Sequence, residues 1–285
     1  MKKILFPTDF SPAATQAYIY ALQLAKAIDA SIVTLHAYQL PSIRGSGLNN
    51  TIAAYLEDLK LEEFENFKDK VPGLHRIAEE NGLGNIPNDH VLELGEPESC
   101  ILRLAKEEQV SLIVMGTTGA TGAKEIFLGS VAGEVMEKAP CPVLAVPKDA
   151  VFDGRIDHLA FTTNFSPEDH LALEWLTAWT ESFQPEIEVI HVDLNHVEEY
   201  AGKMNRFQDA YADQKNLNYT VVDSNDDFET AISEYLATTK TDLVAMVTFK
   251  RTFWQELFNK SHTKQLSYHL NVPIMAMPAA LFASS

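Results

Sequence analysis

Two short segments of the chain carry residue types that could bind an anionic ligand. One contains Asp9, a carboxylate that closely follows a short apolar run. The other is a glycine-rich loop, whose candidate residues are Gly116, Gly119, Lys124, Gly129 and Ser130. Glycines let backbone amides approach phosphate oxygens closely, and a helix that begins near Ser130 would add the positive end of its dipole. The loop therefore predicts an anion cradle; the alternative is a glycine-rich turn that only joins a strand to a helix.

Neither of the two common phosphate-binding motifs is present. The spacing G-x-x-x-x-G-K-[ST] is missing around Lys124. The first apolar run is followed by residues 7–11, which read PTDFS in place of G-x-G-x-x-G. An anion site in this chain would need a different arrangement.

The elements that must position these residues can be predicted from periodicity. Apolar runs without polar alternation are typical of strands covered on both faces, and Ser11 with Pro12 is a typical helix start. Strands are expected at residues 3–8, 32–37, 90–94, 112–115 and 143–146, and helices at 11–28, 50–81, 97–108 and 130–138. Alternating strands and helices predict a parallel sheet with helices on both faces.

The pattern is repeated along the chain. Residues 4–12 recur as 159–167, an offset of 155, and residues 111–115 recur as 242–246, an offset of 131. The second copy is thus shorter in its middle. We predict two domains, 1–149 and 150–285. Strands of the second are expected near 158–162, 187–192, 219–223, 242–247 and 273–277.

Composition narrows the class of protein. The chain has 285 residues and a net charge of −18, so it should repel nucleic-acid phosphates. No apolar run reaches the length of a membrane span, and no secretory signal is evident at the start, so we expect no membrane partner and a cytoplasmic location. The two cysteines, Cys100 and Cys141, form no disulfide or metal pattern and are expected to be packed thiols.

Taken together, these motifs resemble a known family, the universal stress proteins, in a tandem two-domain form. The resemblance rests on residues 7–11 and on Gly116-x2-Gly119-x9-Gly129-Ser130, which has the spacing of that family's ATP-binding signature. It covers the first half and, more weakly, the second. It implies two doubly wound five-stranded α/β domains of the adenine nucleotide alpha hydrolase-like type, each with strand order 3-2-1-4-5. It also implies that the two last strands can pair, so that one chain forms a pseudo-dimer.

The resemblance further implies an ATP site in the first domain. Asp9 would contact the nucleoside end, and the backbone around Ala37 would lie beside the adenine. Ribose and phosphates would be held by Gly116, Gly119, Gly129 and Ser130, with Lys124 as an added charge. The expected ligand is ATP, with Mg²⁺.

The second domain departs from this pattern. Asn164 stands where the first domain has Asp9, and at offset 131 the three glycines become Val247, Lys250 and Lys260. Valine cannot readily adopt glycine dihedrals and would crowd a phosphate. We therefore predict no ATP in the second site, although its basic residues could attract another anion if they are not simply solvated.

Other candidate groups are interpreted as structural. His36 and His191 end equivalent strands and are expected to pack there. His191, Asp193 and His196 could form a metal site only if the following loop brought them together, and no metal site is expected. No arrangement of nucleophile and base is evident, so no catalytic residue is assigned.

The sequence thus predicts an ATP-binding protein of stress response or signalling, with one nucleotide site in the first domain and no efficient catalysis. Two alternatives stay open. One is a slow ATP hydrolase or phosphotransferase built around Asp9, Lys124 and Ser130. The other is an interaction scaffold that works without nucleotide, as a homodimer or with a protein partner.

Overall fold

The computed structural model of the chain describes residues 2–41, 49–117, 130–194, 196, 199–249 and 272–283. The elements of the first half are β1 (Lys2–Pro7), α1 (Pro12–Ala27), β2 (Ala30–Tyr38), α2 (Asn49–Glu80), β3 (Asn88–Leu94), α3 (Pro97–Glu107), β4 (Leu112–Gly116), α4 (Ser130–Lys138) and β5 (Val143–Val146). Those of the second half are β6 (His158–Thr162), α5 (Pro167–Trp179), β7 (Glu186–Asp193), α6 (Glu199–Ala210), β8 (Leu217–Asp223), α7 (Phe228–Ala237), β9 (Leu243–Thr248), β10 (Ile274–Pro278) and a 3-10 turn, Ala279–Leu281. Every predicted strand and helix is confirmed, with ends that shift by at most two residues.

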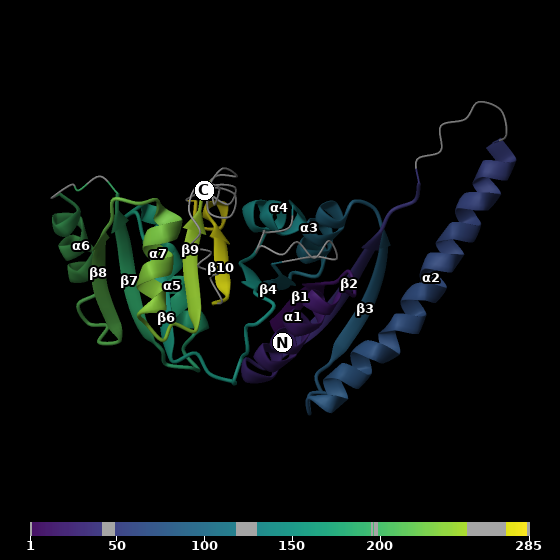
Figure 1. Cartoon of the computed structure of the whole chain (residues 1–285), viewed down its shortest axis with the longest axis horizontal. Helices are drawn as coiled ribbons and strands as arrows, with labels where there is room; N and C mark the ends of the chain where they lie inside the picture. Colours follow the sequence, from purple (N-terminus) through teal and green to yellow (C-terminus); the bar gives the residue numbers. More distant parts are fainter. Residues whose placement is uncertain are drawn as a thin grey trace.

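The strands form a single ten-stranded sheet in the order β3-β2-β1-β4-β5-β10-β9-β6-β7-β8 (Figure 1). Read from each edge of the sheet toward the middle, each half has the predicted order 3-2-1-4-5. Pairing within each half is parallel. The two halves meet where β5 pairs antiparallel with β10, with Leu144 opposite Met275. The expected pairing of the two last strands is therefore confirmed.

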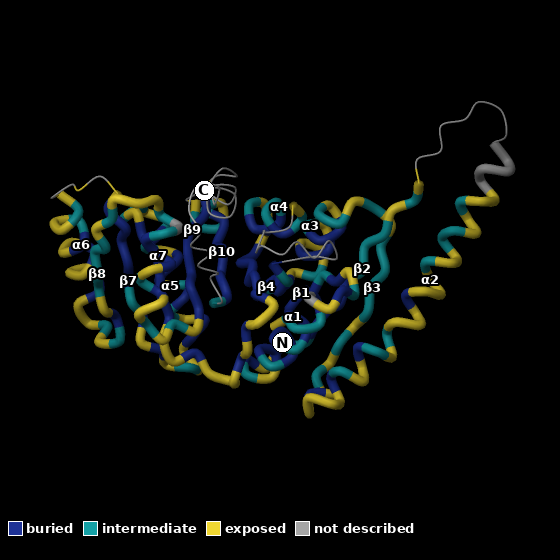
Figure 2. The backbone as a smooth tube through the Cα atoms, viewed as in Figure 1, coloured by how far each residue is buried: buried dark blue, intermediate teal, exposed yellow. Residues whose placement is uncertain are grey.

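Two hydrophobic cores lie on the two faces of this sheet. One contains residues of α1, α2, α5 and α6, and the other contains residues of α3, α4 and α7. Successive residues of a strand alternate between them: Ile4 and Phe6 belong to the first core and Leu5 to the second. The central strands are buried along their length, as the apolar runs predicted (Figure 2).

Helix α2 packs on the sheet only through its C-terminal half. Phe67 and Leu74 are buried, whereas Tyr55, Leu61 and Phe64 are exposed. Figure 1 shows its N-terminal half leaning away from the sheet. The part of α2 that matters for the strand ends is therefore its second half, from about Phe67 onward.

The first helix of each half starts with a serine cap. Ser11 accepts a hydrogen bond from the amide of Ala14, and Ser166 accepts one from the amide of Asp169. The Asp169 carboxylate in turn accepts a hydrogen bond from the Ser166 amide, which completes a capping box that α1 lacks. None of the described helices is both long enough and apolar enough to span a bilayer.

Candidate functional site

The candidate site lies where strand order reverses in the first half. β1 is flanked by β2 on one side and β4 on the other, so the connections leaving β1 and β4 run to opposite sides. Open α/β sheets bind ligands at the carboxyl ends of such neighbouring strands. Asp9 follows β1 and Gly116 ends β4, so the structure brings these two predicted residues to the same edge of the sheet.

The turn that carries Asp9 is held by its own side chains. The Thr8 hydroxyl oxygen accepts a hydrogen bond from the Phe10 amide at 3.0 Å. Asp9 Oδ1 accepts one from the Ser11 amide at 2.9 Å. Phe10 has a φ of +58°, which is uncommon for a residue with a side chain. These bonds hold the strained turn and leave the Asp9 side chain at the surface.

Aromatic rings of β2 and α2 pack against the Phe10 ring of this turn. The ring of Phe10 lies 4.8 Å from that of His36 and 6.1 Å from that of Phe67 on α2. The His36 Nδ1 is 2.8 Å from the carbonyl oxygen of Thr8, to which it donates. The expectation that His36 is a structural histidine at a strand end is therefore confirmed. Lys70 places its ammonium group 4.7 Å from the centre of the Phe10 ring, a cation–π distance.

The remaining predicted residues are placed as follows. Ala37 is in β2, two positions beyond the pair Pro7–Leu35 and one before the end of the strand, so it lies near the same edge of the sheet. Ser130 is the first residue of α4 and is exposed. Gly119, Lys124 and Gly129 lie outside the described residues. The structure thus brings Asp9, Ala37 and Gly116 to one edge of the sheet. The phosphate-binding role of the glycine-rich loop stays a prediction.

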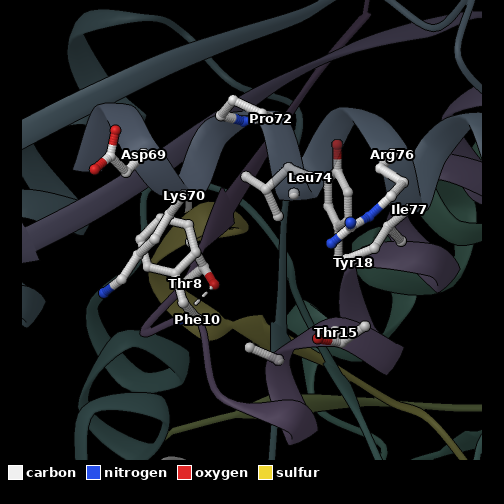
Figure 3. Close-up of a pocket in the computed structure, with 12 residues that line it drawn as sticks. Thr8, Phe10, Thr15, Tyr18, Asp69, Lys70, Pro72, Leu74, Arg76 and Ile77 are labelled. Carbon is white, nitrogen blue, oxygen red and sulfur yellow. Dashed lines mark hydrogen bonds between the residues drawn. The ribbon is translucent and has the colours of Figure 1, made fainter. Parts of the chain in front are cut away.

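A groove of about 430 Å³ opens between α1 and α2 beside this edge (Figure 3). Thr8 and Phe10 line it from the β1 end, and Lys70 and Arg76 from α2. In Figure 3 the Lys70 side chain extends over Phe10, and Arg76 lies beside Tyr18. Asp9 and Gly116 are not among its lining residues, so the groove adjoins the predicted site without containing it.

Sequence reasoning missed the part played by Thr8, Phe10 and Lys70. The signal for the first two was present in the repeat, because Thr8 and Phe10 recur as Thr163 and Phe165 at the same offset as the serine caps. Lys70 stands in the helix expected at 50–81, and nothing in its spacing singles it out. Its position over Phe10 depends on how the second half of α2 packs, which periodicity does not show.

The equivalent edge of the second half has the same turn and a different carboxylate. Phe165 has a φ of +62°, and the Thr163 hydroxyl oxygen accepts from its amide at 2.9 Å. Asn164, which replaces Asp9, is exposed. Asp169, in the first turn of α5, is 2% exposed and accepts three hydrogen bonds through Oδ2. The donors are the Thr163 hydroxyl and the amides of Asn164 and Ser166.

The structure gives no support to a metal site or a reactive thiol. Across the described residues, no group of three or more His, Cys, Asp or Glu side chains is arranged to hold a metal ion. His196 is hydrogen-bonded to Asn225 at 2.9 Å, while His191 donates to Thr163. Cys100 and Cys141 are free and buried, and burial raises the pKa of the Cys141 thiol to about 12. Both cysteines are therefore packed thiols, as predicted.

Known proteins are similar to the first half in sequence and to the whole chain in fold. The sequence model of the universal stress protein family matches residues 1–147. Two universal stress proteins of Methanocaldococcus jannaschii are 37% identical over 147 residues and 32% identical over 159 residues. Each match covers 52% of this chain, and 82% and 95% of the respective relatives.

A crystal structure of a universal stress protein from Archaeoglobus fulgidus has the same fold over nearly the full length. It superposes with a TM-score of 0.69 at 19% identity, covering 96% of this chain and 97% of that chain. The doubled parallel sheet and the match to the first half define the class of protein. The chain belongs to the universal stress protein family.

Proposed function

We propose that this protein binds one ATP molecule, with Mg²⁺, at the ends of β1 and β4 in a first domain spanning residues 1–149, and that it acts in stress response or signalling. The second domain, residues 150–285, binds no ATP in this mode. One observation carries the proposal: Asp9 follows β1 and Gly116 ends β4, and the strand order reverses between these two strands. Ser130 then opens α4 on the far side of the glycine loop.

The residues at this edge suit a nucleotide. Asp9 is an exposed acceptor at the same edge of the sheet as Ala37, where a ribose hydroxyl or an adenine amino group could donate to it. Gly116 has no side chain to obstruct a phosphate, and the loop residues Gly119, Lys124 and Gly129 would complete the cradle. Magnesium on ATP keeps several waters and needs only one or two protein carboxylates, so this edge does not require a cluster of acids.

The second domain is unsuited to the same ligand for a reason beyond its missing glycines. The amides of Asn164 and Ser166 already donate to the buried carboxylate of Asp169. An approaching phosphate would meet that negative charge and the side chain of Val247. The predicted contrast between the two domains therefore has an electrostatic basis as well as a steric one.

The test is calorimetric titration of Mg·ATP into the full chain and matched variants. We expect one site per chain that is lost in Gly116→Val, which copies Val247. We expect Asp9→Ala to weaken binding by about 10- to 100-fold, because it removes one hydrogen bond from a charged acceptor. The control is Asn164→Ala, the equivalent position of the second domain, which should leave the affinity unchanged.

Other outcomes separate the alternatives. Two sites per chain would contradict the assignment of the second domain. No binding at all would favour a nucleotide-independent scaffold, with the glycine loop as a turn. A slow hydrolase or phosphotransferase would release phosphate or transfer it at a rate that Asp9→Ala or Ser130→Ala abolishes, which the proposal does not expect.

A further inference from the structure

A second cavity, of about 250 Å³, lies in the second half at the ends of β6, β7 and β9. It occupies the position equivalent to the predicted ATP site, and Asn164, Asp169, His191 and Val247 are among its lining residues. We propose that this cavity binds a small planar molecule that donates hydrogen bonds and is uncharged or cationic, as an aromatic amine or amidine is. The proposal stands on the second half alone and is independent of ATP binding.

The first observation is an unused hydrogen-bond acceptor. His191 is 4% exposed, and its Nδ1 lies 2.8 Å from the carbonyl oxygen of Thr163. A carbonyl can only accept, so Nδ1 carries a proton, and in this tautomer Nε2 is an acceptor. Nε2 is buried and has no hydrogen-bond partner among the described residues. Buried polar atoms are rarely left unpaired, so a ligand that donates an N–H to Nε2 would satisfy it.

The second observation is the sign of the charge. Asp169 is buried and lines the cavity, and all three of its hydrogen bonds reach Oδ2, which leaves Oδ1 outside them. None of the described lining residues is basic. On α6, the Lys203 ammonium group lies 5.0 Å from the centre of the Tyr200 ring and is paired with Glu199 at 3.5 Å, which balances its charge. The cavity therefore disfavours a phosphate or carboxylate and favours a donor that is neutral or positive.

The third observation is shape. The ring of Tyr200 lies 4.3 Å from that of His191, and Phe228 and Val247 supply further apolar lining. Pockets for drug-sized ligands measure roughly 300–1,000 Å³, so this cavity suits a smaller molecule. A flat ring with one or two N–H groups at its edge could lie against the aromatic side chains while donating to His191 and Asp169.

Two probes of one shape and opposite charge test the proposal. Benzamidine is a planar ring with a cationic, N–H-donating group, and benzoate has the same outline with an anionic acceptor. Each is titrated into the full chain while the methyl resonances of Val192, Leu194 and Val247 are followed by NMR. We expect saturable shifts of these methyls with benzamidine and none with benzoate. Equal shifts with both probes, or no shift of these methyls with benzamidine, would overturn the proposal.

Variants at equivalent positions locate the acceptor. His191→Phe keeps the ring and removes Nε2, so it should weaken benzamidine binding by about tenfold, the value of one hydrogen bond. His36→Phe makes the same change in the first half and should leave that affinity unchanged. An equal loss in both variants would contradict the role of His191. Should His191→Phe not fold, Leu194→Trp at the exposed rim must block binding for the proposal to hold.

Discussion

The two strand-end turns of this protein share a backbone and differ in the place of one carboxylate. Phe10 and Phe165 have nearly the same positive φ, +58° and +62°. Each stands two residues after a threonine. The threonine hydroxyl accepts a hydrogen bond from the phenylalanine amide, and the threonine carbonyl accepts one from a histidine. In the first half the carboxylate, Asp9, is in the turn and exposed. In the second half the turn has Asn164, and the carboxylate sits five residues later, buried at Asp169.

The difference shows how one turn can be stabilised by a carboxylate from two different positions in the sequence. Asp9 holds the Ser11 amide from the outer side and stays at the surface. Asp169 holds the Ser166 amide from within the helix and is no longer exposed to solvent. The equivalent of Asp169 in the first half is Ala14, which brings no charge to the edge. The turn of the second half thus contains a buried carboxylate, and the turn of the first half contains only an exposed one.

The two halves share one sheet, and the largest effect is expected where β5 pairs with β10. Met275, in the middle of the β10 stretch that pairs with β5, is fully buried, and Met275→Asp would place a charge between the halves. We expect a loss of at least about 4 kcal/mol in the free energy of unfolding, measured by denaturant titration. The control Val151→Asp, at an exposed position, should change it by less than about 0.5 kcal/mol. Similar losses in both would show that β10 is not buried against β5.

The next largest effect is the difference in stability cost between removing Asp169 and removing Asp9. Asp169→Ala removes the acceptor of three hydrogen bonds in a buried place and should cost about 3 kcal/mol of stability. Asp9→Ala removes the hydrogen bond to the Ser11 amide at an exposed residue and should cost less than about 1 kcal/mol, although it should weaken ATP binding. Thermal and denaturant unfolding measure both. Equal costs would mean that the two carboxylates do not differ as their burial indicates.

A double variant moves the carboxylate of the second half back into the turn. Adding Asn164→Asp to Asp169→Ala rebuilds the arrangement of the first half, because a carboxylate at 164 can accept from the Ser166 amide as Asp9 does from Ser11. We expect about 1 kcal/mol of the lost stability to return, the value of one such bond. The measurement is a double-mutant cycle in denaturant. No recovery would show that the two turns differ in more than the place of the carboxylate.

The smallest effect concerns pH. His90 in β3 and Tyr219 in β8 occupy equivalent register positions, opposite Thr34 and Val189. Burial, and then the neighbouring His75, lowers the pKa of His90, whereas burial raises that of Tyr219. Between the folded and unfolded pKa of His90 the unfolded chain binds more protons, so stability should fall as pH drops from about 7.5 to about 5.5.

Replacing His90 tests that sign. His90→Tyr copies the second half and removes this titration, so the fall in stability over the same pH range should be smaller in the variant. Denaturant unfolding at both pH values measures it. Tyr219→Phe is the matched control and should keep the pH dependence of the original chain. A steeper fall in His90→Tyr would contradict the lowered pKa of His90.

Much of the fold could be predicted from local sequence. The apolar runs of β4 and β5 and the cap and proline before α1 indicated elements that the structure confirms. The order of the strands within each half, and the pairing of β5 with β10, came with the resemblance to the family. Periodicity alone does not show which strands are neighbours, because that depends on contacts distant in sequence.

The candidate site could be predicted only in part. Asp9 and Gly116 were expected at one edge because parallel strands end together, and the structure places them there. Asp169 was missed because an acid in the first turn of a helix is ordinary in sequence. Only the folded turn shows three donors directed at one of its oxygens. Lys70 was missed because its position depends on where α2 meets Phe10.

The sequence by itself determined the alternation of strands and helices, the repeat, and which residue types stand at each strand end. Those properties follow from periodicity, capping and spacing, which are local. The tertiary structure decided which carboxylate is exposed and which is buried, and that the two halves form one sheet. Burial and the convergence of hydrogen-bond donors arise only when distant segments pack together. For that reason two turns of nearly the same sequence have their carboxylates in opposite environments, one exposed and one buried.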